Sequence, residues 1–282
     1  MMLSETIEQL ATTTQVTGQS HQTAQIYRDK LSHLCDFLGD VPIEDITAAD
    51  LRRYVAHLQE CNLSPSALRI RVRALKRLWD FAEVVGIVKE NPARQIKVTR
   101  RRGEMREWAE TDDILALLEI TQESTPLDLR DRAAILFLSD TGCRVGELCG
   151  LKVDDLDLDA MQASVTKMGK RARCVFFGES TREALQRWLD VRPSDRGPWV
   201  FVSLAGHSKR ALTPSSLHQM LKRRGKAAGC KGPVSPRAFR NAFIRSLIVD
   251  GCNLETLSRL LGHSSTEVTV SHYAMFETGG AK

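Results

Sequence analysis

Residues 261–273 read Leu261-Gly262-His263-Ser264-Ser265-Thr266-Glu267-Val268-Thr269-Val270-Ser271-His272-Tyr273, which places a phenol ten residues after an imidazole. Two arginines precede this stretch in marked settings: Arg144 in Thr141-Gly142-Cys143-Arg144-Val145-Gly146-Glu147-Leu148, and Arg240 in Ser235-Pro236-Arg237-Ala238-Phe239-Arg240. A guanidinium stays protonated at physiological pH and binds two phosphate oxygens at once. The set therefore predicts a phosphodiester that is held by cations and attacked by a phenol.

The composition is that of a soluble protein with one large domain or two modest ones. The chain has 282 residues and a formal net charge of +5, and it contains no apolar run long enough to span a bilayer. Residues 1–14 are polar and do not resemble a signal peptide. Seven scattered cysteines without a C-x-x-C pair indicate neither a disulfide framework nor a zinc site. We therefore expect a cytoplasmic protein with no metal and no membrane partner.

Basic residues gather in three clusters. A single charge run usually marks a solvated helix face, and for any one cluster this is the better interpretation. Three clusters that flank the candidate site favour contacts with a phosphate backbone. The clusters are Arg69, Arg71, Arg73, Lys76 and Arg77; Lys97, Arg100, Arg101, Arg102 and Arg106; and Lys222, Arg223, Arg224, Lys226 and Lys231.

Apolar periodicity predicts a helical domain over residues 20–97, built as a small bundle. Ser64-Pro65 is typical of a helix start, and Asn91-Pro92 ends the last helix. Residues 1–19 are expected to form a polar segment outside this domain. Residues 98–106 are basic and lack periodicity, which indicates a linker that either crosses a DNA groove or is a plain solvated tether.

Residues 107–282 are expected to form a second domain that is mostly helical with one β-hairpin. Strand-like runs cover Gln162–Thr166 and Arg173–Phe177, and Trp199–Val202 is a further candidate strand. Helices are predicted near 133–141, from Arg144 through Leu148, over 237–249 and over 254–261. The fold class expected is therefore mainly α with a small β-hairpin or sheet.

The arginines have simpler explanations when each is taken alone. Arg144 opens a helix whose N-terminus adds positive field, but it could equally be a surface residue paired with Glu147. Arg240 lies away from the apolar face of its helix, and Arg237 can point the same way from one turn earlier. A solvated basic face would explain Arg237 and Arg240 as well as a bound anion would.

His263, Lys167 and Tyr273 complete the candidate site. His263 could donate to a phosphate oxygen, although a histidine at a helix end often bonds backbone carbonyls. Lys167 at the hairpin tip could protonate a departing alkoxide, or could serve solubility alone. Tyr273 has a free pKa of about 10, and nearby guanidiniums would favour its phenolate. The alternative for Tyr273 is a buried structural tyrosine.

In their order and local sequence context, these residues resemble the tyrosine recombinase (phage integrase) family over about residues 20–276. The first half resembles the family's helical core-binding domain, with the Thr23-Ala24-Gln25-Ile26-Tyr27 opening and the Asn91-Pro92-Ala93 exit. The second half resembles its mixed α/β catalytic domain. The matched positions are Arg144 in T-G-x-R-x-x-E-L, Lys167 in the hairpin, the second arginine Arg240, His263 in L-G-H-S-S, and the nucleophile Tyr273.

The resemblance implies site-specific DNA strand exchange without metal, ATP or another cofactor. The Tyr273 oxygen would attack the scissile phosphate to form a 3′-phosphotyrosyl link, while Lys167 protonates the departing 5′ oxygen. Two duplexes with paired recombination sites imply a homo-tetramer on DNA at the nucleoid. The phosphate would be held by Arg144, Arg237, Arg240 and His263. DNA contacts are expected from Arg69, Arg71, Arg73, Lys76, Arg77, Arg100, Arg101 and Arg102.

One position departs from the family pattern. The family usually has H-x-x-R where this chain has Arg237-Ala238-Phe239-Arg240, and Asn241 replaces a frequent second histidine. Arg237 can donate hydrogen bonds but cannot accept the proton of Tyr273. Three alternatives therefore stay open: a catalytically weak or inactive DNA-binding protein of the same fold, a type IB-like topoisomerase, and an unrelated helical adaptor.

Overall fold

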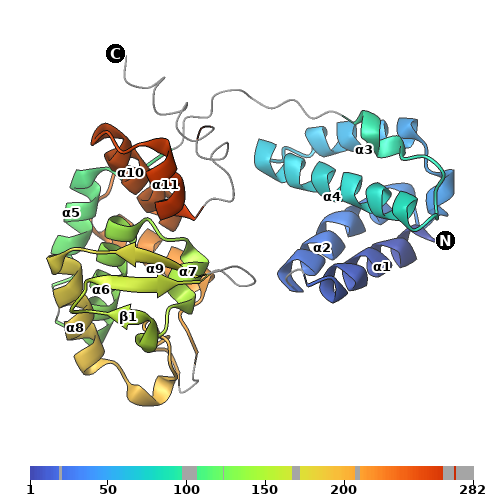
Figure 1. The fold of residues 1–282 in the computed structure, drawn as a ribbon. Helices are drawn as coiled ribbons and strands as arrows, with labels where there is room; N and C mark the ends of the chain where they lie inside the picture. Colours follow the sequence, from blue (N-terminus) through green and yellow to red (C-terminus); the bar gives the residue numbers. More distant parts are fainter. Residues whose placement is uncertain are drawn as a thin grey trace, which may run out of the picture. The chain divides into compact units, whose positions relative to one another are not determined.

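A computed structural model describes residues 1–18, 21–96, 107–122, 124–166, 172–206, 210–262 and 270. The chain forms two compact units, Met1–Arg102 and Gly103–Lys282, each with a hydrophobic core (Figure 1). The linker predicted over residues 98–106 lies outside the described residues. Within the described ranges, no helix is long and apolar enough to cross a membrane.

The first unit is a helical bundle, as the sequence predicts. Its helices pack their apolar faces around the fully buried Trp79 and Tyr54. Ser64 caps the longest helix, because its Oγ accepts a hydrogen bond from the Ala67 amide at 3.2 Å. The elements are α1 (Leu3–Val16), α2 (His21–Leu38), η1 (Ile43–Asp45), α3 (Ala48–Glu60), α4 (Pro65–Val84) and η2 (Pro92–Gln95).

Helix α1 corrects the expectation that residues 1–19 lie outside the helical domain. Leu3, Ile7 and Leu10 are buried in the core of the first unit. Thr6 and Thr14 are buried on the same helix, and their hydroxyls donate to carbonyls one turn back at 2.9 and 2.7 Å. Because the hydroxyls are satisfied locally, these threonines can face the core. The polar composition of the segment hid a packed helix.

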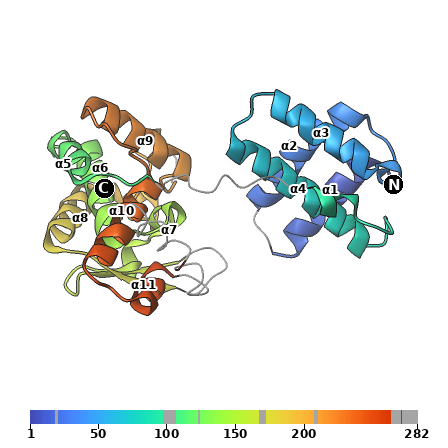
Figure 2. The same ribbon diagram turned by 90° about the horizontal axis from the view of Figure 1, so that it is seen from above.

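The second unit surrounds one central helix, α6, which contacts α5, α8, α10 and β3. Figure 2 shows α9 on the opposite side of this unit from the strands. Its elements are α5 (Thr111–Glu119), α6 (Pro126–Thr141), α7 (Val145–Gly150), η3 (Val153–Asp155), β1 (Leu156–Asp157), β2 (Gln162–Val165), β3 (Arg173–Phe176), α8 (Glu179–Val191), η4 (Ser194–Arg196), α9 (Pro214–Ala227), α10 (Pro236–Val249) and α11 (Leu254–Leu261).

The strands form an antiparallel sheet in the order β1-β2-β3. β2 and β3 are the two arms of the predicted hairpin, and Val165 lies opposite Arg173 in their register. The strand predicted over Trp199–Val202 is wrong as a continuous element. Only its ends pair, since Trp199 and Val202 form isolated bridges with Lys152 and Ala211. The fold class is nevertheless the expected one, mainly α with a small sheet.

Candidate active site

Arg144 is the N-cap residue of α7 and is held there by Glu147. Its backbone amide donates to Glu147 Oε2 at 2.7 Å, and its Nη1 contacts Oε1 at 2.9 Å. This pairing satisfies an amide at the helix start. The Arg144 side chain is still 31 % exposed, so part of the guanidinium remains open to solvent.

Arg240 extends from α10 to the ends of two other helices. Its Nη1 donates to the Gly142 carbonyl at 2.7 Å, and its Nη2 donates to the Leu261 carbonyl at 2.9 Å. Carbonyls at a helix end lack donors within their own helix and carry the negative end of its dipole. Arg240 therefore joins the turn before Arg144 to the end of α11.

Arg173, at the start of β3, is a third arginine of this site. Its Nη2 contacts Glu147 Oε2 at 2.8 Å, and its Nη1 donates to the Leu260 carbonyl. Arg144 completes the series by donating from Nη2 to the Gly262 carbonyl at 3.3 Å. Three guanidiniums from three elements thus contact consecutive carbonyls at the end of α11.

Two glycines make this close approach feasible. Gly142 ends α6 and Gly262 ends α11, both in the left-handed backbone region with φ of 52° and 60°. A Cβ on Gly262 would lie 2.6 Å from Cδ of Arg173, and a Cβ on Gly142 would collide with the ring of Phe243. A side chain at either position would disturb both the turn and the packing beside it.

The site has more positive than negative charge among its described residues. Three guanidiniums face the single buried carboxylate of Glu147. Burial and the charges of Arg144 and Arg173 together lower the pKa of Arg240 to about 10, against the opposing effect of Glu147. Burial alone would raise the pKa of Glu147, but hydrogen bonds from Arg173 and Arg144 outweigh it and lower this pKa. An anion would relieve the repulsion among the arginines.

Only part of the predicted site falls within the described residues. The structure brings Arg144 and Arg240 together as expected. Arg237 is exposed one turn before Arg240, and it makes no hydrogen bond or ion pair with another described residue. Lys167, His263 and Tyr273 lie outside the described part of the chain.

Sequence reasoning missed Arg173, although a signal was present. Arg173, Val175 and Phe177 are alternate residues along β3 and the position after it, and the last two are buried. A charged residue in the inward phase of a strand needs a buried partner. Glu147 was considered only as a partner of Arg144, whereas it binds both arginines.

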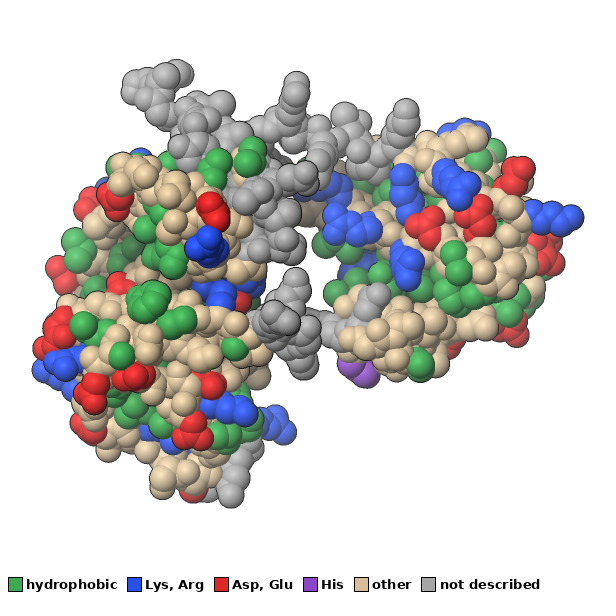
Figure 3. All heavy atoms as spheres, viewed as in Figure 1, with side chains coloured by type: hydrophobic (Ala, Val, Ile, Leu, Met, Phe, Trp, Pro, Cys, Tyr) green, Lys and Arg blue, Asp and Glu red, His purple; other side chains and the backbone are tan. Residues whose placement is uncertain are grey.

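Four of the five cations predicted on α4 share one face of that helix. Arg69, Arg73, Lys76 and Arg77 lie within an arc of about 100° at 100° per residue, and none of them forms an ion pair with another described residue. Figure 3 shows Lys and Arg side chains on the face of the first unit that carries α4. Arg100, Arg101 and Arg102 lie outside the described residues.

Arg71 is on the other side of α4. It continues the stripe of Leu75 and Leu78, both fully buried. Burial raises the pKa of Tyr54 to about 12, and the nearby charge of Arg71 opposes that rise. Arg71 is only partly buried, and its expected role in DNA contact stays a prediction.

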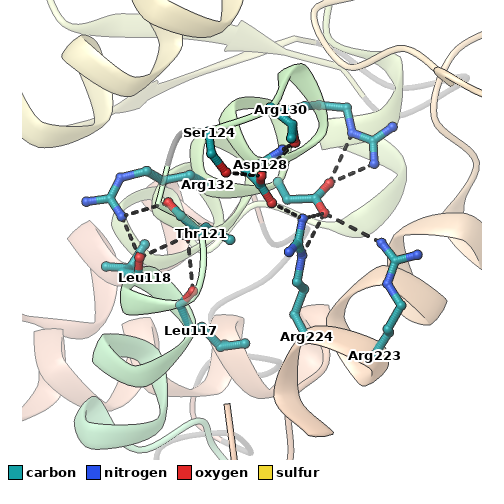
Figure 4. Close-up of polar contacts among 11 residues, drawn as sticks. Leu117, Leu118, Thr121, Ser124, Asp128, Arg130, Arg132, Arg223 and Arg224 are labelled. Carbon is teal, nitrogen blue, oxygen red and sulfur yellow. Dashed lines mark hydrogen bonds and ion pairs between the residues drawn. The ribbon is translucent and has the colours of Figure 1, made fainter. Parts of the chain in front are cut away.

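The third basic cluster is also divided. Arg224 of α9 donates from Nε to Asp131 Oδ2 at 3.0 Å and from Nη2 to Asp128 Oδ1 at 2.6 Å. Arg130 binds Asp131 Oδ1 at 2.7 Å. Figure 4 shows Arg223 and Arg224 extending toward α6, where the latter meets Asp128. Arg223 keeps a largely exposed side chain, and Lys222, Lys226 and Lys231 are exposed as well, whereas Arg224 links helices and is not free for phosphate.

Comparisons with known proteins agree with this architecture. The profile of the phage integrase family matches residues 107–278, and that of the phage integrase N-terminal SAM-like domain matches residues 7–84. The tyrosine recombinase XerC of Alcanivorax borkumensis is 30 % identical over 256 residues, covering 89 % of this chain and 82 % of the relative. XerA of Thermococcus kodakarensis is 28 % identical, covering 95 % and 93 %.

Solved structures show the same fold. The Tn1549 transposon integrase in complex with circular intermediate DNA superposes with a TM-score of 0.75 at 20 % identity, covering 98 % of this chain and 99 % of that one. XerH bound to a palindromic difH substrate superposes with a TM-score of 0.76 at 18 % identity, covering 92 % and 78 %. The chain belongs to the phage integrase family. Within that family it is a tyrosine recombinase, an enzyme of site-specific DNA recombination.

Proposed function

We propose that this recombinase cuts and rejoins double-stranded DNA through a covalent link to Tyr273. The phenolic oxygen attacks the scissile phosphorus, the P–O5′ bond breaks, and a 3′-phosphotyrosyl bond replaces it. Lys167 supplies the proton that the departing 5′ oxygen takes up. The 5′ hydroxyl of a partner strand then attacks the link and releases the tyrosine, so no cofactor is needed for the energy of rejoining.

The observation that carries this proposal is the surplus of positive charge around Glu147. Arg144 and Arg240 are fixed in place before any ligand binds, because both already bond to protein groups. Preorganised donors stabilise charge that develops on phosphate oxygens without a cost of reorganisation. His263 and Arg237 complete the set of donors in this proposal. Arg237 is exposed and has donors to spare for a phosphate.

The DNA partner and its assembly follow from the same proposal. Arg69, Arg73, Lys76 and Arg77 on α4, which form no ion pair with another described residue, would contact the phosphate backbone. Arg100, Arg101 and Arg102 would extend this contact along the chain. Exchange between two duplexes at paired sites requires four cuts and therefore a homo-tetramer on DNA. Such a protein would work at the nucleoid in the cytoplasm.

A DNA-binding protein without strand cleavage is the second candidate, and Arg237 favours it. An arginine cannot accept the proton that Tyr273 must lose. Restoring a histidine should settle what this position does: if proton acceptance limits the reaction, Arg237→His cleaves about 10²-fold faster at neutral pH. If Arg237 acts only as a phosphate donor, the substitution leaves cleavage unchanged or slows it.

The proposal is tested by trapping the covalent intermediate. A duplex selected from a randomised library by binding to the protein is nicked so that the short strand released by cleavage diffuses away. We expect a covalent protein–DNA adduct whose modified peptide contains Tyr273 and which is absent in Tyr273→Phe.

The same experiment separates the alternatives. Tight binding of the selected duplex without any adduct would support the non-cleaving protein. Relaxation of supercoiled plasmids that lack the selected site would support a topoisomerase.

A further inference from the structure

We propose that Arg173 is a positioning residue of the recombination reaction, holding the carbonyl end of α11 beside Arg144 and Glu147. This inference rests on the proposed function, because it concerns how the chain enters the part of the site that contains His263. Arg173 itself would not touch the DNA. Its side chain is only 12 % exposed, and its contacts are with protein groups.

Arg173 joins three elements of the described site. It belongs to β3 by its backbone, binds Glu147 of α7 through Nη2, and binds the Leu260 carbonyl of α11 through Nη1. Glu147 is the residue that also holds Arg144. Arg173 therefore fixes the end of α11 to the same carboxylate that fixes a phosphate-binding arginine.

The hydrophobic contacts of α11 do not fix its end in the same way. The helix is anchored by Leu257 and Leu261, which pack with Ile244 of α10 in a small separate cluster. These contacts hold α11 against α10 but not against the sheet. Without Arg173, α11 would stay folded on α10, while its last turn would lose its polar bond to β3.

The backbone at Gly262 is fitted to the Arg173 side chain. A Cβ at Gly262 would approach Cδ of Arg173 to 2.6 Å and Nε to 3.1 Å. The guanidinium stem thus lies directly against the residue that precedes His263. Because the planar fork of arginine serves a carboxylate and a carbonyl together, lysine could keep only one of the two contacts.

The test compares Arg173→Met and Arg173→Lys with a control on α11, Arg259→Met. Arg259 pairs with Glu255 at the surface of α11, so its replacement removes one charge without touching the site. For each full-length protein we would measure the affinity for the selected duplex, the single-turnover rate of adduct formation at saturating protein, and hydrogen exchange of the peptide that covers 254–262.

We expect Arg173→Met to bind DNA almost as tightly as the parent protein. It should form the adduct about 10²-fold more slowly, since a misplacement of about 1 Å has an effect of that size. Exchange at the last turn of α11 should be faster. The rate of adduct formation by Arg173→Lys should fall between the rates of Arg173→Met and the parent protein. Arg259→Met should match the parent in rate and affinity.

A substrate with sulfur in place of the departing 5′ oxygen identifies the step that is affected. A thiol has a pKa of about 8.5, so this leaving group departs without a proton donor. The Lys167→Ala defect should disappear with this substrate, and the Arg173→Met defect should remain. Recovery of Arg173→Met to the parent rate would mean that Arg173 serves leaving-group protonation, and would overturn the proposal.

The possible failures are distinguishable. If the parent protein and Arg259→Met form no adduct, the proposed function itself is wrong, and the positioning role is wrong with it. If both form the adduct and Arg173→Met forms it at the same rate, only the positioning role is wrong. A parallel loss of DNA affinity and rate in Arg173→Met would show a general structural role and would also contradict it.

Discussion

Two groups of buried arginines in the second unit differ in how their charge is balanced. Between α6 and α9, Arg130 and Arg224 face two carboxylates, those of Asp128 and Asp131, and the exposed Arg223 also lies 3.9 Å from Asp131. At the end of α11, Arg144, Arg173 and Arg240 share one carboxylate among the described residues, that of Glu147. The α6–α9 network is complete within the protein, whereas the active-site cluster retains excess positive charge.

Under the proposed function, this difference separates arginines that stabilise the fold from arginines that bind the scissile phosphate. In the α6–α9 network, hydrogen bonds from Thr125 and Arg224 outweigh burial and lower the pKa of Asp128, and the paired aspartates raise the pKa of Arg224. In the active-site cluster, the pKa of Arg240 falls to about 10 because burial and neighbouring cations both oppose its charge. Under the proposed function, the scissile phosphate would complete the charge balance there.

The largest expected effect is a loss of stability when an aspartate of the α6–α9 network is replaced. Asp131→Ala leaves Arg130 and Arg224 facing a single remaining aspartate, and breaking a buried pair costs about 3–5 kcal/mol of stability. Urea unfolding at pH 7 measures this loss. Asp195→Ala is the matched control, because its 3.8 Å pair with Arg196 involves a largely exposed carboxylate. If the two variants were equally stable, the α6–α9 network would not be structural.

A comparable effect on rate, rather than on stability, is expected in the active-site cluster. Arg240→Met should slow single-turnover adduct formation by about 10²–10³-fold, as for the loss of one preorganised donor. Arg224→Met, in the balanced network, should cleave at the parent rate per folded molecule at 20 °C. Equal slowing of both variants would remove the distinction between the two groups.

The single carboxylate of the active-site cluster gives it a particular dependence on pH. The pKa of Glu147 lies below its ordinary value of 4.5, so its stabilising effect is complete above pH 4.5 and is lost as the pH falls through the lowered pKa. Glu147→Gln should lower the free energy of unfolding by about 2 kcal/mol at pH 7. This difference from the parent should shrink below pH 4.5. The exposed Glu179→Gln serves as control, and a difference that is constant with pH would contradict the assignment.

The smallest expected effect is on the salt dependence of DNA affinity, and it compares two arginines of the first unit. Arg73→Ala should reduce the slope of log affinity against log salt concentration by about 0.9, the value for one lost phosphate contact. Arg94→Ala should leave the slope unchanged, because Arg94 is already paired with Glu83 at 2.6 Å. Titrations of the selected duplex over a range of salt concentrations would measure both slopes. The same slope in both variants would exclude the α4 face as a DNA contact.

Features set by local chemistry could be predicted from the sequence. Ser64 and Pro65 start α4, and Gly142 and Gly262 end their helices, because caps depend on a few neighbouring residues. The hairpin strands were predicted to within one residue at their ends. Arg144 and Arg240 were recognised because both lie beside such local signals.

Features set by tertiary contacts could not be predicted in the same way. The basic clusters that contain Arg71 and Arg224 do not reveal which side of its helix each residue occupies, and both residues lie beside buried groups. The helix α1 was hidden because its buried threonines bond their own backbone. Arg173 was missed because its carboxylate partner is 26 residues away, on another element.

The central claim is that the surplus positive charge of the active-site cluster holds the scissile phosphate. The most direct test removes one positive charge from the protein and the negative charge from the phosphate. Adduct formation would be compared on nicked duplexes with either a normal phosphate or an uncharged methylphosphonate at the scissile position, for the parent protein and Arg144→Ala. We predict that Arg144→Ala is strongly impaired on the phosphate and largely recovers on the methylphosphonate, because the neutral group no longer needs the missing cation. Equal impairment of Arg144→Ala on both substrates would contradict the account.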